Sequence, residues 1–336
     1  MTAAHALILA PFTESQLAQL RSVIEVSHES WMDTRRLYDP DELAKRLLKE
    51  NSSILVIESD FAFEEMFQQV PDLRFVGICR AATNHVDVEA ATESGILVVN
   101  APGRNARAVA EHTLGLMLAL ARKIPRSHEY VVGGRWQDPT EPYMTLRGVE
   151  LYGRNVGIFG LGAIGLMVAE ICHALGMNVI GYDPYADVIP EGIRRVELDE
   201  LLMSSDFVNV HMPLTPETEG MLNSARIGMM KPTAFLVSAS DAGVFEGNSL
   251  VDALKRKSIA GAALDVFESH PISPQNPLLA LDNVVLTPHI GGATEETIER
   301  HSHMMTDDIL RFLNNEIPVN LVNPGAWKSN QKPKRS

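Results

Sequence analysis

The strongest constraint on how this chain folds is the stretch from Val156 to Gly165, which reads VGIFGLGAIG. Four apolar residues, typical of a buried strand, lead into a G-x-G-x-x-G turn. An apolar, helix-like segment follows, and a second apolar run then delivers Asp183, 18 residues after Gly165. Strand, glycine turn, helix, strand and acid in this order are what a dinucleotide-binding unit requires.

Each part of this stretch has a physical role in holding a dinucleotide. Gly160 allows the tight turn, Gly162 lets the backbone approach a pyrophosphate, and Gly165 lets helix and strand pack closely. The helix N-terminus, at Ala163 and Ile164, faces the phosphates. Asp183 can accept hydrogen bonds from the adenosine ribose and would repel a 2′-phosphate, which favours NAD over NADP as the cofactor.

Composition excludes several classes of partner. The 336 residues allow two domains, and 45% hydrophobic residues predict an ordinary globular protein. With 43 acidic and 29 basic side chains the net charge is −14, which argues against nucleic acid or an anionic membrane as a main partner. Two cysteines, Cys79 and Cys172, lie in apolar runs, as expected of buried thiols in a reducing compartment. There is neither a signal-peptide pattern nor a metal motif, so we expect a cytoplasmic protein without a metal.

Strand and helix signals alternate along the chain, which predicts an α/β fold with parallel sheets. Ala101-Pro102-Gly103 interrupts the pattern and is the expected hinge. Thr13 with Gln16, and Thr294, are expected to cap helices. Strands are expected at 6–10, 53–57, 75–79, 96–100, 156–159, 178–181, 207–211, 234–237, 259–265 and 284–287, and helices at 14–23, 41–49, 86–93, 106–122, 163–175, 249–257 and 294–314. The helix at 106–122 is apolar nearly all round, which predicts a buried interdomain or subunit-interface helix.

Five segments of the chain, in order, resemble the D-isomer-specific 2-hydroxyacid dehydrogenase family. Besides the glycine turn they are VVNAPG at 98–103, HMPLTPET at 211–218, GAALDVFE at 261–268 and LTPHIGG at 286–292. The resemblance implies a doubly wound NAD-binding Rossmann domain at 102–293, inserted into a flavodoxin-like substrate domain at 1–101 and 294–327. It also implies a homodimer formed through the nucleotide domain. The basic tail at 328–336 is expected to be disordered.

The resemblance also implies three catalytic positions, of which this chain keeps one. His289 stands where the family has a histidine that exchanges a proton with the substrate hydroxyl. Asp241 stands where the family has an arginine that holds the substrate carboxylate, and His270 where it has a glutamate that orients the histidine. The charge is therefore reversed at the position that grips an anion.

Other positions carry roles only through the resemblance. The loop after the third strand begins Arg80-Ala81-Ala82 and would contact substrate, although it lacks the family's glycines. Arg80 or Arg147 could replace the lost cation. Beyond the glycine turn and Asp183, the expected cofactor contacts are His211, Met212, Pro213, Thr218, Ala239, Ser240, Asp241, Asp265, His289, Gly291 and Gly292.

Three readings stay open at this point. In the first, the chain is an NAD-dependent dehydrogenase acting on a hydroxy acid, a 2-keto acid or a related hydroxy compound. Asp241 would then pair with His289 or His270 in place of the missing glutamate. In the second, it is a pseudoenzyme that binds NAD(H) as a sensor or scaffold. In the third, an unrelated NAD-dependent activity uses the same site. The intact cofactor positions, Asp265 among them, favour an enzyme.

Overall fold

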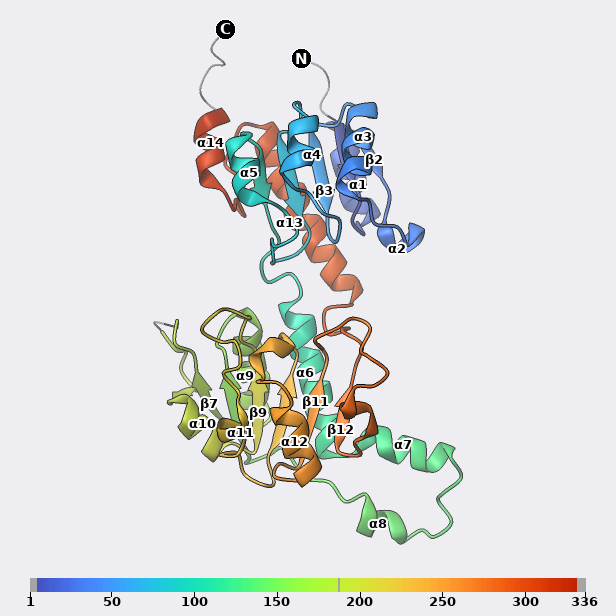
Figure 1. The fold of residues 1–336 in the computed structure, drawn as a ribbon, viewed down its shortest axis with the longest axis vertical. Helices are drawn as coiled ribbons and strands as arrows, with labels where there is room; N and C mark the ends of the chain where they lie inside the picture. The colour runs from blue at the N-terminus through green and yellow to red at the C-terminus, as the bar shows by residue number, and fades with distance from the viewer. Residues whose placement is uncertain (1–4, 187, 331–336) are drawn as a thin grey trace. The chain divides into compact units, whose positions relative to one another are not determined.

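The computed structural model describes residues 5–186 and 188–330, which form two compact units (Figure 1). The split unit contains the residues up to Arg104 and from Thr294 onward, and the inserted unit runs from Asn105 to Ala293. The chain thus passes between the units three residues after Ala101 and again after Ala293. Both units are built on parallel sheets, which confirms the predicted α/β class.

The split unit has a five-stranded sheet in the order β2-β1-β3-β4-β5, the flavodoxin-like arrangement. Its strands are fully buried except for β2, as expected of a parallel sheet covered on both faces. The strands are β1 His5–Ile8, β2 Glu25–His28, β3 Ile54–Ile57, β4 Phe75–Ile78 and β5 Leu97–Val99. The helices are α1 Glu14–Arg21, α2 Trp31–Thr34, α3 Pro40–Lys49, α4 Glu64–Gln69, α5 Val88–Glu93, α13 Glu295–Leu313 and α14 Pro324–Asn330.

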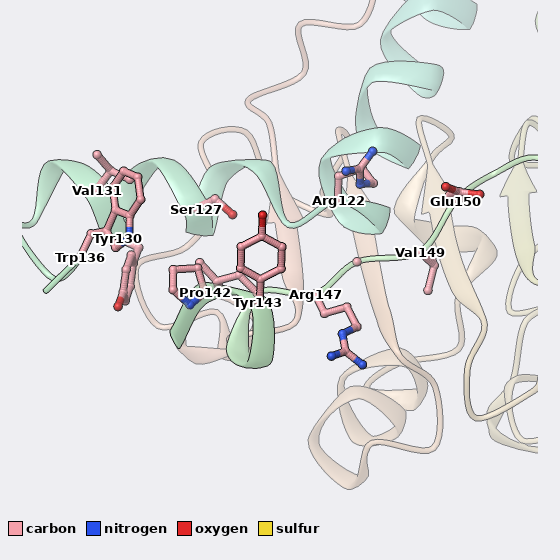
Figure 2. Close-up of a pocket in the computed structure, with 12 residues that line it drawn as sticks. Arg122, Ser127, Tyr130, Val131, Trp136, Pro142, Tyr143, Arg147, Val149 and Glu150 are labelled. Carbon is pink, nitrogen blue, oxygen red and sulfur yellow. The ribbon is translucent and has the colours of Figure 1, made fainter. Parts of the chain in front are cut away.

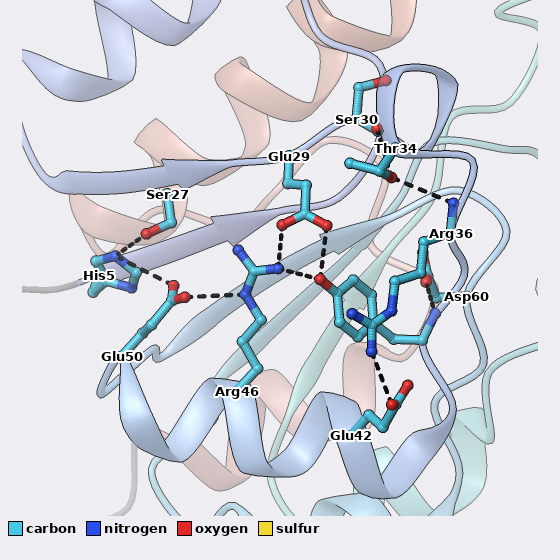
Figure 3. A network of polar contacts seen from close by, with 11 residues as sticks. His5, Ser27, Glu29, Ser30, Thr34, Arg36, Glu42, Arg46, Glu50 and Asp60 are labelled. Carbon is cyan, nitrogen blue, oxygen red and sulfur yellow. Dashed lines mark hydrogen bonds and ion pairs between the residues drawn. The ribbon is translucent and has the colours of Figure 1, made fainter.

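The edge strand β2 carries no apolar run, so its sequence does not predict it. A polar network on the neighbouring helix α3 and the loops beside it fixes the chain next to β2 (Figure 3). The Arg46 guanidinium binds Glu29 and donates to Glu50 Oε1 at 3.0 Å, while Tyr38 Oη donates to Glu29 Oε1 at 2.7 Å. Tertiary hydrogen bonds therefore stabilise a strand that apolar periodicity leaves unmarked.

The inserted unit has a seven-stranded sheet in the order β12-β11-β10-β9-β6-β7-β8. Counted from β6, this is the Rossmann order, with its topological switch between β6 and β9. The strands are β6 Asn155–Phe159, β7 Asn178–Tyr182, β8 Arg194–Arg195, β9 Phe207–Val210, β10 Phe235–Ser238, β11 Gly261–Leu264 and β12 Val284–Leu286. The helices are α6 Ala106–Ala121, α7 Ile124–Val132, α8 Glu141–Thr145, α9 Ala163–Ala174, α10 Leu198–Ser204, α11 Ser224–Ile227, η1 Ala242–Val244, α12 Ser249–Arg256 and η2 Pro277–Ala280.

The apolar helix α6 is buried inside its own unit. It packs on α9 and on strands β10, β11 and β12, so its apolar faces are largely covered without a second domain or subunit. Lys123 then adopts a left-handed conformation with φ 52°, and helix α7 begins at Ile124 with Pro125 in its first turn. The helices α7 and α8 form an arm that projects from the body of the unit (Figure 1), and neither has a buried residue.

Three local predictions have different outcomes. Thr294 caps α13 through a hydrogen bond from Thr297 N, as predicted. The capping box of Thr13 and Gln16 is wrong, because Thr13 N donates to Ser302 Oγ at 3.1 Å and Gln16 Oε1 has no partner. Helix α14 continues to Asn330, into the segment 328–336 that the sequence predicts to be disordered, and positions 331–336 lie outside the described residues.

Candidate active site

The glycine turn after β6 has the geometry that a pyrophosphate site needs. Gly160 has φ +101°, a conformation that favours glycine, and a Cβ there would lie 2.8 Å from the backbone of His211. A Cβ on Gly165 would overlap the carbonyl oxygen of Gly160. At Gly162, the N-cap of α9, a Cβ would meet nothing within 4 Å, so open space faces this helix N-terminus, where Ala163 and Ile164 begin the first turn.

Asp183 follows β7 and is tied to the same turn. Its Oδ2 accepts from Leu161 N and its Oδ1 accepts from Tyr185 N, both at 2.8 Å. Each carboxylate oxygen has two lone pairs, so both can still accept a hydrogen bond from a ribose hydroxyl. The acid is therefore held in place beside the turn, as a dinucleotide requires.

The loop after β9 borders the turn from the other side of the switch point. His211 N donates to Phe159 O at 2.7 Å, and the buried His211 Nε2 has no hydrogen-bond partner. Burial lowers the pKa of His211 to about 4. Met212 is buried, and the loop is closed where Thr218 Oγ1 donates to Pro213 O at 2.6 Å. An unpaired ring nitrogen beside the glycine turn is an observation that fits a bound nucleotide.

Asp241 follows β10 at the same edge of the sheet. Ser240, next to Ala239, donates its hydroxyl to Val210 O at 2.8 Å, which joins this segment to the end of β9. Asp241 Oδ1 accepts from Gly243 N at 2.9 Å and caps the η1 turn, while the side chain is exposed. Asp241 thus bonds to the backbone of the turn that follows it.

Asp265 and the turn after β12 are joined by a dense set of hydrogen bonds. Asp265 is 1% exposed, and its carboxylate accepts from Ile290 N at 3.0 Å and Gly291 N at 2.8 Å. Thr287 Oγ1 donates to the same carboxylate at 2.6 Å, and His289 N donates to Asp265 O at 2.8 Å. These bonds hold His289 in a left-handed conformation with φ 55°, which costs a non-glycine residue about 1 kcal/mol. A Cβ on Gly292, at the end of the turn, would lie 3.0 Å from Asn105.

His289 and His270 form an imidazole pair. His289 Nδ1 lies 3.1 Å from His270 Nε2, and the rings are 4.9 Å apart between centroids and tilted by 46°. In a hydrogen bond between two ring nitrogens one donates and the other accepts, so a single proton lies between them. His270 thus contacts the nitrogen of His289 that the glutamate of the family was expected to contact.

The predicted substrate loop belongs to the split unit, where it follows β4. Asn100 Nδ2 donates to Ala81 O at 2.7 Å, and Ala101 N donates to Arg80 O at 2.9 Å, so the backbone beside Ala82 is fixed. His85, at the end of the loop, is 4% exposed, and neither of its ring nitrogens has a partner. Burial, and then the charge of Arg80, lower the pKa of His85 to about 4.

Arg147 cannot serve as the replacement cation beside His289 in this unit. It lines a pocket of about 400 Å³ together with Phe235, Ala260 and Val284, which lie at the amino-terminal ends of β10, β11 and β12. Asp241, His270 and His289 follow the carboxyl-terminal ends of those strands, at the opposite edge of the sheet. The expectation for Arg147 is therefore wrong.

A second pocket, of about 480 Å³, lies on the arm (Figure 2). Tyr130, Val131 and Trp136 gather at one end of it, and Tyr143 lies between α7 and α8. This pocket is remote from the carboxyl-terminal edge of the sheet, so it belongs to the arm and not to the dinucleotide site. The residues that line it include one carboxylate, Glu150, and no histidine.

The sequence does not mark His112 as a site residue. It lies on α6, 175 positions before Thr287, and its Nε2 is 3.0 Å from Thr287 Oγ1. The one signal in the sequence is a histidine in a largely apolar helix. Among the described residues, no group of three or more metal-ligating side chains could hold a metal ion. No helix in the described part of the chain is long and apolar enough to cross a membrane.

Comparison with known proteins agrees with this geometry. Residues 114–291 match the family model "D-isomer specific 2-hydroxyacid dehydrogenase, NAD binding domain". The chain is 40% identical over 284 residues to a glyoxylate reductase of Korarchaeum cryptofilum, covering 84% of this chain and 85% of that protein. It is 37% identical over 324 residues to a D-3-phosphoglycerate dehydrogenase of Archaeoglobus fulgidus, covering 94% of this chain but 59% of that longer protein.

A solved structure, the TT0316 protein from Thermus thermophilus, superposes with a TM-score of 0.82 at 34% identity, covering 95% of this chain and 99% of that one. The matched family domain binds NAD, and the residues around Gly160, Gly162 and Asp183 fit that cofactor. The chain belongs to the family of D-isomer-specific 2-hydroxyacid dehydrogenases.

Proposed function

We propose that the chain catalyses NAD-dependent hydride transfer at a CH–OH carbon, with His289 as the acid–base group and His270 as its partner. The observation that carries this proposal is the His289–His270 hydrogen bond of 3.1 Å, which lies in the same unit as the dinucleotide turn. Bound NAD supplies the hydride acceptor. The other groups of the site would act on the proton.

The imidazole pair can do what a histidine–carboxylate pair does. When His270 Nε2 accepts from His289 Nδ1–H, the lone pair of His289 is on Nε2, which is the nitrogen that takes the hydroxyl proton. The resulting imidazolium still donates to His270. A neutral imidazole stabilises that cation less than a carboxylate does, so we expect a functional but weaker pair.

Asp241 governs which substrate fits. The segments that follow β10, β11 and β12, at 239–248, 265–280 and 287–293, contain four carboxylates and no Lys or Arg. Two like charges 4 Å apart repel by about 1 to 4 kcal/mol at the effective dielectric of water or of a protein surface. We therefore expect a hydroxy or keto compound without a carboxylate near Asp241, or an acid whose carboxylate is held by Arg80, Ala81 and Ala82.

The test is NADH consumption across matched pairs of 2-keto acids and the corresponding neutral ketones and aldehydes. His289→Asn should lower kcat about a hundredfold, the usual size of an acid–base effect, while NADH binding stays intact. Asp241→Arg should raise kcat/KM for 2-keto acids at least about tenfold, because it restores the cation. Asp241→Asn is the matched neutral control, and its kcat/KM for 2-keto acids should lie between those of the wild type and Asp241→Arg.

An active His289→Asn variant would rule out the acid–base assignment. Tight NADH binding by the wild type without consumption of any compound in the panel is the outcome expected of a pseudoenzyme, and it would overturn the proposal. No gain in a folded Asp241→Arg variant would reject the role given to Asp241 alone.

We also infer that the protein is a cytoplasmic homodimer that pairs through the arm. Tyr143 is 79% exposed, Val132 72% and Met144 70%, and all three lie on the arm, where a cluster of exposed apolar side chains is typical of an interaction site. Cys79 and Cys172 are buried thiols without a disulfide, which suits a reducing compartment.

A further inference from the structure

The side chain of His112, which lies outside the turn at 287–293, lies close to the Asp265 carboxylate that binds this turn. His112 Nε2, on α6, lies 3.0 Å from Thr287 Oγ1 and 3.4 Å from Asp265 Oδ1. The hydroxyl of Thr287 has one hydrogen, and it is directed to Asp265 Oδ1 at 2.6 Å. Thr287 must therefore accept from His112, which means that His112 Nε2 carries a hydrogen.

The contact orients one of the donors to Asp265. Its carboxylate receives Thr287 Oγ1, Ile290 N and Gly291 N, with His112 Nε2 behind the threonine. Because Asp265 is 1% exposed, water cannot replace a donor that is lost. The position of the turn that carries His289 therefore depends on a residue of a different helix.

We propose that His112 is a positioning residue for the reaction. It orients the Thr287 hydroxyl toward Asp265, and Asp265 in turn holds the backbone of His289, Ile290 and Gly291. This inference rests on the proposed function, since it assigns His289 to the reaction. The contact of His112 is with Thr287, so His112 acts through the turn.

The packing of His112 supports this role over that of a surface residue. Its side chain is 21% exposed, whereas the preceding Glu111 points to solvent. A polar ring that points to the interior requires a hydrogen-bond partner, and the partner of His112 is Thr287, in the turn that carries His289. If the donor were lost, the strained backbone at His289 could relax, and displacing a reacting group by about 1 Å can cost about a hundredfold in rate.

The experiment compares two substitutions at one site. His112→Leu removes the donor, whereas His112→Gln places an amide N–H near the position of Nε2. His173→Leu is the matched control, because His173 is an exposed histidine on helix α9 of the same unit. Thr287→Val removes the hydroxyl with little change in volume and should behave as His112→Leu does. Each full-length variant is assayed for kcat, for NADH affinity, and for amide hydrogen exchange of the peptide 287–293 by mass spectrometry.

His112→Leu and Thr287→Val should lower kcat about tenfold to a hundredfold, with NADH affinity within about threefold of the wild type. They should also lose exchange protection at 287–293. His112→Gln should recover most of the rate and the protection, and His173→Leu should change neither. A general packing defect would instead affect His112→Gln and His112→Leu alike.

Wild-type kcat and protection in folded His112→Leu would overturn the proposal, and so would a His112→Gln variant as impaired as His112→Leu. If the wild type turned over no compound, the proposed function would fail. The exchange measurement would still decide whether His112 holds the turn, so the two failures are distinguishable.

Discussion

In the glycine turn, Gly165 and Gly162 differ in what an added Cβ atom would meet. A Cβ on Gly165 would overlap Gly160 O, so the constraint there comes from the fold itself. At Gly162 a Cβ would meet only open space, so the fold does not require glycine there and we expect the bound cofactor to require it. The sequence motif marks both positions without separating these two reasons.

Alanine substitutions at these two glycines should therefore have different effects, one on stability and the other on cofactor binding. Gly165→Ala should destabilise the protein by about 1 to 3 kcal/mol through overpacking. Gly162→Ala should leave the melting temperature unchanged but weaken NADH binding at least about tenfold, because its methyl group would occupy the pyrophosphate position. Thermal melts and NADH fluorescence titrations measure the two effects. Equal melting temperatures for both variants would contradict this account.

His85 predicts how stability depends on pH. Its pKa is lowered to about 4 by burial, and then by Arg80, from an ordinary value near 6.5. Between these values the unfolded chain binds the proton and the folded chain does not, so stability is lost as pH falls through this window. At about 1.4 kcal/mol per unit the loss reaches about 2 to 3 kcal/mol.

His85→Phe removes the proton site and nearly keeps the ring volume. Its free energy of unfolding should fall less than that of the wild type between pH 6.5 and 4.5, as measured by urea unfolding. The exposed His303→Phe is the control and should follow the wild type. Parallel pH profiles for wild type and His85→Phe would show that His85 does not titrate as described.

At the scale of the elements, the arm exposes apolar side chains that the rest of the inserted unit does not cover. The apolar faces of helix α6 are covered by α9 and the sheet, whereas α7 and α8 expose apolar side chains around the pocket in Figure 2. The sequence favoured α6 as the interface because it is the more apolar helix. Because α6 is already covered within its own unit, the exposed side chains of the less apolar arm are the better candidates for an interface.

The arm yields a prediction about assembly. The double variant Tyr143→Lys with Met144→Lys should sediment as a monomer at micromolar concentration, where the wild type should sediment as a dimer. Two lysines that must be buried unpaired would cost several kcal/mol. Val319→Lys, at a position 66% exposed in the split unit, is the control and should stay dimeric. A monomeric wild type would refute the proposed pairing.

For the whole molecule, the chain order of its two sheets explains why the functional residues are scattered in sequence. The switch point between β6 and β9 brings Gly160 beside the loop of His211, and the ends of β10, β11 and β12 bring in Asp241, His270 and His289. Parallel strands with all carboxyl ends on one edge gather residues that lie more than a hundred positions apart. Arg147 follows no strand end and lies at the opposite edge.

The sequence by itself determined the alternation of strands and helices, the NAD-binding turn, the family and the cap at Thr294. These follow from local periodicity, from glycine conformation and from short-range hydrogen bonds, all of which a short stretch of chain contains. Only the tertiary structure decided that β2 joins a sheet, that His270 pairs with His289, and that His112 reaches Thr287. Each of these contacts joins residues whose proximity depends on the packing of separate elements, and polar side chains have no periodicity that would predict it.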